Sequence, residues 1–264
     1  MLQLSGVSKT FNAGTINEKK ALIDINFTLA PGDFVTVIGG NGAGKSTLLN
    51  LVSGAYTSDA GSIVLDGENI TFQPEHKRAR MLGRVFQDPM RGTAADMEII
   101  ENLALAYRRG KRRGLSWGIT KPEREIFHER LKLLELGLET RMNSKVGLLS
   151  GGQRQALTLL MATLQKPKLL LLDEHTAALD PKTARQVLHL TRDFIEKDGL
   201  TTLMVTHNMK DAIKYGNRLI MMHEGRIVYE VSGEEKKNLQ VEDLLKKFGT
   251  VSGNEFANDR MLLS

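Results

Sequence analysis

The chain has 264 residues, a formal net charge of +5, 41% hydrophobic residues and no cysteine. The lack of cysteine excludes disulfides, thiolate metal sites and thiol catalysis. No apolar run approaches the roughly 18 residues of a membrane span, and residues 1–6 lack the basic and apolar regions of a signal peptide. These features are typical of a cytosolic globular protein with one sizeable core. The mildly basic charge permits a nucleic acid or an anionic membrane surface as neighbour without requiring either.

The chain begins with predicted strands. Residues 2–11 and 21–29 are predicted as strands on either side of a polar turn. A second turn at residues 31–33 contains proline and glycine. The next apolar run, 34–38, predicts a third strand, which leads directly into a glycine-rich segment.

The segment 39–47, GGNGAGKST, has the G-x-x-x-x-G-K-[ST] spacing of a P-loop and precedes the apolar helix at 48–52. Glycines let the backbone curl so that successive N–H groups point at an anion, and a helix N-terminus favours phosphate. Lys45 supplies a charge for the β- and γ-phosphates, and Ser46 offers a hydroxyl to Mg²⁺. An ordinary glycine turn is the alternative, but the flanking strand and helix favour nucleoside triphosphate binding. The residues expected at the nucleotide are Gly39, Asn41, Gly42, Ala43, Gly44, Lys45, Ser46 and Thr47.

Beyond the P-loop helix, residues 62–65 and 83–87 are predicted as strands. Gln87 therefore lies at a strand end, where a side chain can reach a ligand above the sheet, although by itself it is an ordinary polar loop residue. Residues 94–109 and 121–138 then show apolar side chains at helical spacing. The basic run 108–113 between them predicts a solvated loop; a nucleic-acid patch and a contact with lipid headgroups are the alternatives.

A further helix is predicted from Ser150 to about residue 164, with Ser150 as its N-cap. Gly151 and Gly152 leave the start of this helix bare, which again suits an anion. Ser-Gly-Gly is also a common flexible turn, so this segment becomes informative only in combination with the acidic strand downstream.

The apolar strand 169–172 ends in two carboxylates, Asp173 and Glu174. A strand that is apolar on both faces indicates a parallel sheet covered by helices. Asp173 is placed to hold Mg²⁺ directly or through water, and Glu174 is a candidate general base for an attacking water. A solvated acidic turn is the alternative. The upstream P-loop argues against it, because a P-loop enzyme needs an acidic partner on a neighbouring strand.

The last third continues the alternation of helix and strand. A helix is predicted over 182–197 behind Pro181, and the buried strand 201–206 carries His207 at its end. A lone histidine is more often structural, but this one comes after a third strand end on the expected ligand side. Strands at 218–222 and 226–231 flank a turn, and residues 249–264 are expected to form a flexible tail.

Taken together, these residues resemble the nucleotide-binding subunit of an ATP-binding cassette (ABC) transporter. The motifs match in order over almost the whole chain, and the signature is the most specific, since many unrelated NTPases share the P-loop and the acidic strand. They are the P-loop at 39–47, the glutamine loop at Gln87, the signature at 149–153, the acidic strand at 169–174, the aspartate loop at 178–180 and the switch histidine His207.

The resemblance implies an α/β P-loop NTPase fold with a RecA-like core, an antiparallel β subdomain and an inserted α-helical subdomain. The cassette would span residues 1–248, with the helical insertion at about 88–165. One departure is His175, because proline often follows the catalytic glutamate in this family. The implied cofactors are ATP and Mg²⁺. The implied sites are catalytic Glu174, His207 and Gln87; nucleotide-binding Phe11 (stacked on adenine), the P-loop, Ser150, Gly151, Gly152, Gln153 and Asp180; and metal-binding Ser46, Gln87 and Asp173.

The resemblance also implies partners. Two copies are expected to pair head to tail as a homodimer, with each ATP between one P-loop and the partner's signature. A single cassette without a membrane span requires permease subunits as separate chains, as is typical of prokaryotic importers. The chain would then be peripheral, on the cytoplasmic side of the inner membrane, and an extracytoplasmic solute-binding protein would complete the system. Nucleic acid is not an expected partner.

The helical insertion, with residues 98–103 and its basic loop, looks like those of amino-acid importers, so import of a small solute such as an amino acid is the predicted function. The alternatives are an exporter ATPase and a cassette ATPase that transports nothing, such as an assembly, DNA-repair or translation factor. The translation type usually has two cassettes and the repair type a long coiled coil, and this sequence shows neither feature.

Overall fold

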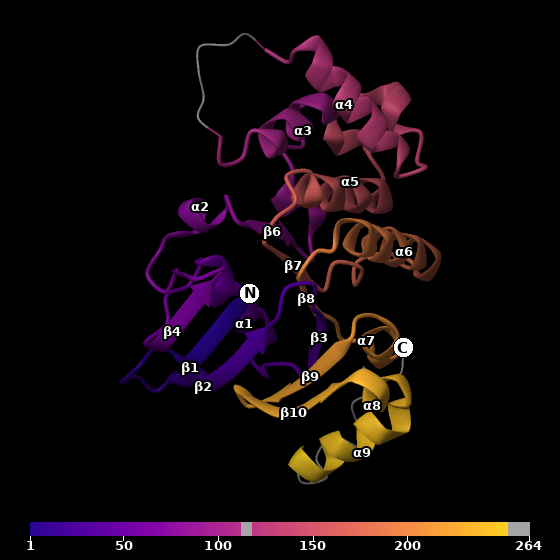
Figure 1. Ribbon diagram of the computed structural model, residues 1–264. Coiled ribbons are helices and arrows are strands. Elements are labelled where there is room, and N and C mark those ends of the chain that lie inside the picture. The colour runs from indigo at the N-terminus through magenta and orange to yellow at the C-terminus, as the bar shows by residue number, and fades with distance from the viewer. Residues whose placement is uncertain (112–117, 253–264) are drawn as a thin grey trace. The chain divides into compact units, whose positions relative to one another are not determined.

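The computed structural model describes residues 1–111 and 118–252 (Figure 1). The chain divides into two compact units. Unit 1 comprises Met1–Arg78 and Leu200–Ser264, and unit 2 comprises Ala79–Gly199.

Unit 1 contains an antiparallel sheet built from the N-terminal strands. Its order is β2-β1-β4-β5, and Leu2 on β1 pairs with Leu29 on one side and Leu65 on the other. The inward side chains of β1 are fully buried, which gives the sheet an apolar face. The strands are β1 (Leu2–Phe11), β2 (Lys19–Leu29), β4 (Ala60–Leu65) and β5 (Glu68–Asn69).

The other strands of unit 1 centre on β3 (Phe34–Gly39), which pairs in parallel with both β8 (Thr202–Val205) and β9 (Arg218–His223). Strand β10 (Arg226–Ser232) pairs with β9 in the antiparallel direction. Every residue of β3 and β8 is buried, as expected for parallel strands covered on both faces. The helices of unit 1 are α1 (Lys45–Ser53), α2 (Glu75–Arg78), α7 (Met209–Lys214), α8 (Gly233–Lys237) and α9 (Val241–Ser252).

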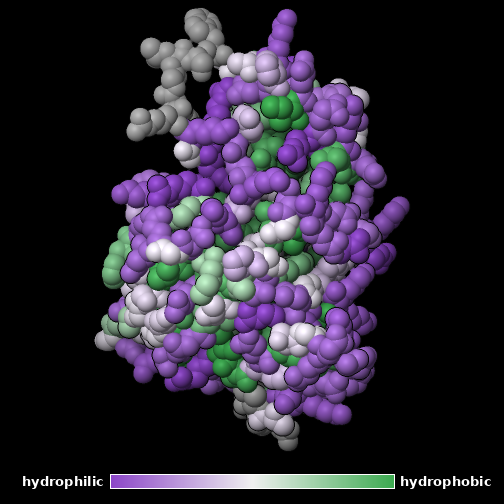
Figure 2. Space-filling model, in the orientation of Figure 1, coloured by the Kyte–Doolittle hydropathy of each residue, from purple (hydrophilic) through white to green (hydrophobic). Residues whose placement is uncertain are grey.

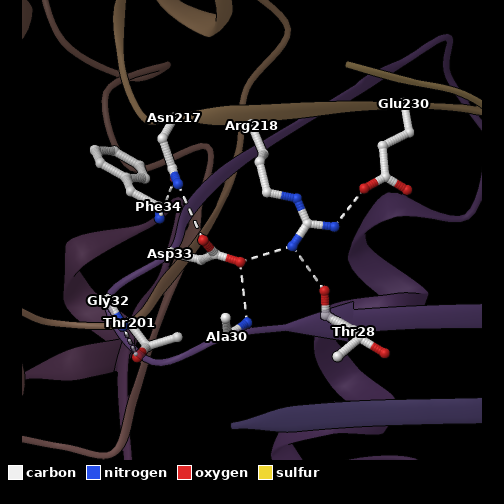
Figure 3. A network of polar contacts seen from close by, with 9 residues as sticks. All are labelled: Thr28, Ala30, Gly32, Asp33, Phe34, Thr201, Asn217, Arg218 and Glu230. Atoms are coloured by element: carbon white, nitrogen blue, oxygen red, sulfur yellow. Dashed lines mark hydrogen bonds and ion pairs between the residues drawn. The ribbon is translucent and has the colours of Figure 1, made fainter. Parts of the chain in front are cut away.

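A polar network fixes the entry to β3 (Figure 3). The Asp33 carboxylate accepts hydrogen bonds from Asn217 Nδ2 at 3.0 Å and from the Ala30 amide at 2.9 Å, and pairs with Arg218 Nη1 at 2.6 Å. Arg218 also pairs with Glu230 of β10. Burial raises the pKa of Asp33, but the hydrogen bonds and the Arg218 charge outweigh burial and hold that pKa below its usual 3.8. The network therefore ties the turn before β3 to β9 and β10.

Unit 2 pairs two parallel strands, β6 (Leu82–Val85) and β7 (Leu169–Asp173), and carries mostly helices (Figure 1). Leu169 to Leu172 are fully buried. The helices are α3 (Ile99–Tyr107), α4 (Lys121–Lys132), α5 (Gly151–Thr163) and α6 (Pro181–Asp198), with 3₁₀ turns at Pro89–Gly92, Leu138–Arg141 and Val146–Leu148.

Two predicted helices are shorter than the sequence suggested. Helix α3 begins at Ile99, not at residue 94, because Glu98 and Glu101 form a capping box that starts the helix there. Helix α4 ends at Lys132, not at residue 138, and Glu135 adopts a φ of 54° just beyond it.

Helix α9 extends to Ser252, so residues 249–252 of the expected tail are helical. The rest of that tail, 253–264, lies outside the described residues.

The prediction of a solvated basic loop is wrong for its first two residues. Arg108 Nη2 pairs with Glu123 at 3.0 Å, and Arg109 Nη2 donates to the Ala162 carbonyl at 3.2 Å. Both side chains therefore serve packing within unit 2. Residues 112 and 113 of the run lie outside the described residues, and the predicted insertion at 88–165 stays a prediction.

Hydrophilic side chains predominate on the face shown in Figure 2, with hydrophobic ones scattered among them. Large apolar side chains that stand exposed include Ile16, Phe72 and Leu148. Across the described part of the chain, the helices are all too short or too polar to cross a bilayer.

Candidate functional site

The P-loop connects β3 to α1 in unit 1, and its glycines are sterically required. Gly44 is the N-cap of α1 with a φ of 101°, a left-handed conformation that favours glycine. A β-carbon at Gly44 would lie 2.5 Å from the Ala21 carbonyl oxygen, so no other residue fits. The backbone is thus bent tightly just where the N–H groups of a helix start become available to an anion.

Lys45 is held within this loop. Its side chain is 7% exposed, and its Nζ donates to the carbonyls of Gly39 at 2.7 Å and Gly40 at 3.1 Å. The ammonium therefore lies beside the loop backbone, where a phosphate bound by the N–H groups would meet it. Ser46 and Thr47 come next, in the first turn of α1.

His207 belongs to the same edge of unit 1 as the P-loop. The parallel register of β3 and β8 pairs Val37 with Val205. Continued for two residues, this register sets His207 level with Gly39, the first residue of the loop. The predicted γ-phosphate contact is therefore compatible with the strand arrangement.

Phe11, the predicted adenine-stacking residue, lies at the end of β1. Its ring packs edge-on against Tyr56 with a centroid distance of 5.3 Å. Across the strand pair it faces Lys19, whose Nζ lies 3.4 Å from the position of a β-carbon at Gly42. Sequence reasoning missed both Lys19 and Tyr56. Strand pairing brings Lys19 opposite Phe11, and Tyr56 reaches Phe11 from the loop between α1 and β4.

Unit 2 brings the glutamine loop and the acidic strand together. Strands β6 and β7 run in parallel with Val85 opposite Leu172, so by register Gln87 comes level with Glu174. A basic side chain missed by sequence reasoning also lies here: Arg84 Nη2 approaches Asp173 Oδ2 at 3.6 Å. The carboxylate of Asp173 is therefore partly neutralised within its own unit.

Glu174 begins the turn after β7 with a φ of 43°, which is uncommon for a residue other than glycine. The next residue, His175, is only 2% exposed, and its Nε2 lies 3.0 Å from Thr191 Oγ1 on α6. Burial lowers the pKa of His175 to about 4, so the ring is neutral at pH 7. The departure from proline thus places a buried polar ring directly behind Glu174.

The signature opens α5, and its start is less bare than the sequence suggested. Ser150 Oγ accepts from the Gln153 amide at 3.3 Å, while Gln153 Oε1 accepts from the Ser150 amide at 3.1 Å. This capping box uses two of the donors at the helix start. The Ser150 side chain remains exposed, and Gly151 and Gly152 add no side chain in front of the helix end.

Asp180 is the N-cap of α6 and accepts from the amides of Lys182 and Thr183, both at 3.1 Å. Hydrogen bonds from Thr183 and Lys182 lower the pKa of the Asp180 carboxyl. Its side chain therefore has a structural role in this chain, whatever else it contacts.

The predicted residues accordingly form two groups. Unit 1 holds Phe11, the P-loop and His207, and unit 2 holds Gln87, Asp173, Glu174, Asp180 and the signature. Strand register sets His207 level with the P-loop in unit 1 and Gln87 level with Glu174 in unit 2.

The donors suit Mg²⁺ and a triphosphate. Among residues 1–111 and 118–252, no cluster of three or more acidic, histidine or cysteine side chains forms a metal cage. Mg²⁺ needs none, because it usually takes one or two protein oxygens and completes its shell with water and phosphate oxygens. In unit 1, Ser46 offers such an oxygen beside the glycine-lined P-loop, which fits the phosphates; in unit 2, Asp173 offers another.

Comparison with known proteins decides the family. The ABC transporter family model matches residues 22–177, which is more than half of the chain. The chain belongs to the ABC transporter family. It is an ATPase cassette of that family, and the relatives it matches are named as transport or import ATP-binding proteins.

This ABC cassette is 46% identical over 248 residues to the tyrosine transport ATP-binding protein of Clostridioides difficile, covering 94% of this chain and 98% of the relative. It is 35% identical over 236 residues to the spermidine/putrescine import ATP-binding protein PotA of Haemophilus influenzae, covering 89% of this chain. The cassette spans only 59% of that relative's length.

Solved structures agree with the ABC fold. A dimeric ATP-binding cassette in a post-hydrolysis state, bound to ADP and Pi, superposes with a TM-score of 0.75 at 31% identity, covering 88% of this chain and 98% of that chain. A second ATP-binding cassette, in its ADP conformation, gives a TM-score of 0.77 at 27% identity, covering 94% of this chain and 98% of that chain. The cassette fold, an α/β P-loop NTPase, is therefore established for this chain.

Proposed function

We propose that this chain hydrolyses ATP to drive the import of an amino acid, with an aromatic amino acid such as tyrosine as the first candidate. The observation that carries the proposal is the 46% identity to a tyrosine transport ATP-binding protein over nearly the full length of both chains. The polyamine importers are a second candidate, at 34–35% identity. Amino-acid import is favoured, because the match to the tyrosine transport protein has the higher identity and spans nearly the full length of both chains.

In this proposal the P-loop binds the ATP phosphates, and Lys45 neutralises the β- and γ-phosphates. Ser46, Asp173 and Gln87 would hold Mg²⁺, which would supply further positive charge to the phosphates. Glu174 accepts the proton of the attacking water, and His207 contacts the γ-phosphate. Phe11 stacks on the adenine.

The proposed working unit is a head-to-tail pair of cassettes. Each ATP would lie between the P-loop of one copy and Ser150–Gln153 and Asp180 of the other, which gives the open face of the α5 start a phosphate to bind. Separate permease subunits would hold the pair at the cytoplasmic side of the membrane, near Gln87 and the helical insertion. An extracytoplasmic solute-binding protein would deliver the solute.

Two substitutions separate binding from hydrolysis. Lys45→Ala should weaken ATP binding, because the phosphates lose their nearest fixed cation. Glu174→Gln should bind ATP with unchanged affinity but hydrolyse it very slowly, since an amide cannot accept the water's proton. Equilibrium ATP binding and steady-state hydrolysis measure the two effects. A wild-type hydrolysis rate in Glu174→Gln would rule out the general-base role.

Mixed dimers test the head-to-tail arrangement. A dimer of one Lys45→Ala chain and one Ser150→Arg chain collects both lesions in a single site and leaves the other site intact. A chain with both substitutions, paired with a wild-type chain, damages each site once. The first dimer should occlude one ATP and the second none. Equal occlusion by the two dimers would show that the sites are not shared between chains.

Uptake and co-purification test the transport role. Cells that lack this chain should lose uptake of labelled tyrosine and keep uptake of labelled putrescine, and Glu174→Gln should not restore uptake. In mild detergent the chain should carry a polytopic permease. The reverse uptake pattern would favour polyamine import, and recovery only with soluble ribosomal or assembly proteins would end the transporter proposal.

A further inference from the structure

A buried polar contact anchors the turn after Glu174 to helix α6. His175 and Thr191 are 2% and 1% exposed, and His175 Nε2 lies 3.0 Å from Thr191 Oγ1. The two residues are 16 positions apart, so the contact joins the loop end of β7 to the middle of α6. A buried polar pair stabilises and rigidifies its surroundings most when its hydrogen bonds are satisfied.

The second contact of Thr191 fixes the direction of this hydrogen bond. Thr191 Oγ1 lies 2.8 Å from the carbonyl oxygen of Val187, one helical turn earlier. A carbonyl only accepts, so the single hydroxyl proton of Thr191 is donated to Val187. Only lone pairs of Oγ1 then remain for His175. The imidazole is therefore the donor, and its proton is on Nε2.

The residue held by this anchor is next to Glu174, whose φ of 43° is unfavourable for a side chain with a β-carbon. Such a conformation persists only where the surroundings impose it. Within the turn, the Ala177 amide donates to the Glu174 carbonyl at 2.9 Å, and the Leu179 amide donates to the Thr176 carbonyl at 3.2 Å. His175 adds a directional contact to a rigid helix.

We propose that His175 is a positioning residue: its Nε2–H···Oγ1 hydrogen bond to Thr191 holds the Glu174 turn in the orientation that hydrolysis requires. The inference rests on the proposed role of Glu174 as general base. Proline at position 175 would restrict the same turn through its ring, whereas this chain restricts it through a side-chain hydrogen bond to α6.

Two matched pairs of substitutions test the anchor. Thr191→Val removes the acceptor with little change of volume, and Thr191→Ser keeps it. His175→Met removes the donor with an unbranched apolar side chain, and His175→Gln keeps an N–H near the position of Nε2. Thr191→Val and His175→Met should each lower kcat about tenfold, the scale of a small misplacement of a reacting group, with KM for ATP within about twofold of wild type.

The conservative members, Thr191→Ser and His175→Gln, should retain most of kcat. The double variant His175→Met/Thr191→Val should be no slower than the slower single variant, because both changes break one bond. Steady-state hydrolysis by the full chain, with thermal unfolding as the fold check, gives every value. Should one pair not fold, the other pair decides alone.

The contrary results are distinct. A lowered melting temperature with wild-type kcat in Thr191→Val and His175→Met would make the contact purely structural and overturn the inference. So would additive losses in the double variant, or a raised KM at unchanged kcat. Glu174→Gln is measured alongside: if it hydrolyses ATP at the wild-type rate, the proposed general base fails. If it is inactive while Thr191→Val is normal, only the positioning role fails.

Discussion

Gly152 and Thr183 touch so closely that no side chain fits between them. A β-carbon at Gly152 would lie 2.1 Å from Thr183 Cγ2, and Thr183 is itself bonded to Asp180. At the neighbouring Gly151, a β-carbon would lie 3.5 Å from Leu179 Cδ2, an ordinary contact distance. The two neighbouring glycines therefore differ in their steric surroundings. Gly152 must lack a side chain for α5 to pack against α6, whereas the space beside Gly151 admits a β-carbon.

Gly152→Ala should destabilise the protein by about 1–2 kcal/mol, since overpacking costs about 1–3 kcal/mol and the helix gains only about 0.5–1 kcal/mol from alanine. The matched Gly151→Ala should be neutral or slightly stabilising. Chemical denaturation measures both. Adding Thr183→Ser, which removes Cγ2, should restore much of the loss in Gly152→Ala. An equal loss in the two alanine variants would contradict the steric explanation.

Lys19 and Lys20 offer a paired test of charge near the P-loop. Lys19 faces Phe11 and approaches Gly42, whereas Lys20 pairs with Thr10. Adjacent residues of a strand point to opposite faces. Lys19→Gln should therefore weaken ATP binding about two- to fivefold, as expected for an exposed charge, and more so at low salt. Lys20→Gln should bind ATP like wild type. Equal effects would show that only net charge matters.

The Asp33 network predicts a loss of stability in acid. The folded-state pKa of Asp33 lies below the ordinary value of this side chain. The contribution of Asp33 to folding stability is therefore complete above about pH 4 and is lost as the pH falls through the lower folded-state pKa. Asp33→Asn should cost about 1–2 kcal/mol at pH 7. This difference from wild type should shrink below about pH 4. Glu230→Gln, which removes the more exposed partner of Arg218, should cost less at pH 7. A difference that stays constant down to about pH 2 would contradict the assignment.

Lys236 predicts a gain of stability in base. It is 2% exposed, donates to the carbonyls of Ile213, Tyr215 and Gly216, and burial lowers its pKa to about 8. Between about pH 8 and about pH 10 the unfolded chain binds more protons at this lysine, so the folded state gains stability as the pH rises.

Lys236→Met should therefore be less stable than wild type at pH 7, because three carbonyls lose their donor. The difference in unfolding free energy between wild type and Lys236→Met should grow by about 1–3 kcal/mol between pH 7 and about pH 9.5. Lys237→Met, at a neighbouring side chain that is 71% exposed, is the control and should show no such trend. A deficit that narrows with pH would mean that the buried amine stays charged.

The sequence by itself determined the family and the nucleotide motifs. The P-loop, the signature and the acidic strand are runs of neighbouring residues whose chemistry depends on local spacing, so they can be recognised without a fold. Strand positions such as β3 and β7 could be predicted from apolar runs, because parallel strands buried on both faces leave that mark in the sequence. The ends of α3 and α4 could not, since capping side chains and a positive φ decide them.

Only the tertiary structure decided which distant side chains support the motifs. Strand pairing brings Lys19 opposite Phe11, and helix packing brings Thr183 against Gly152 and Thr191 against His175. Sequence spacing carries no trace of these contacts, because they depend on how separate elements meet. The substitution of histidine for proline after Glu174 was visible at once in the chain. Its meaning required the buried hydroxyl 16 residues away, which the fold alone brings within hydrogen-bonding distance.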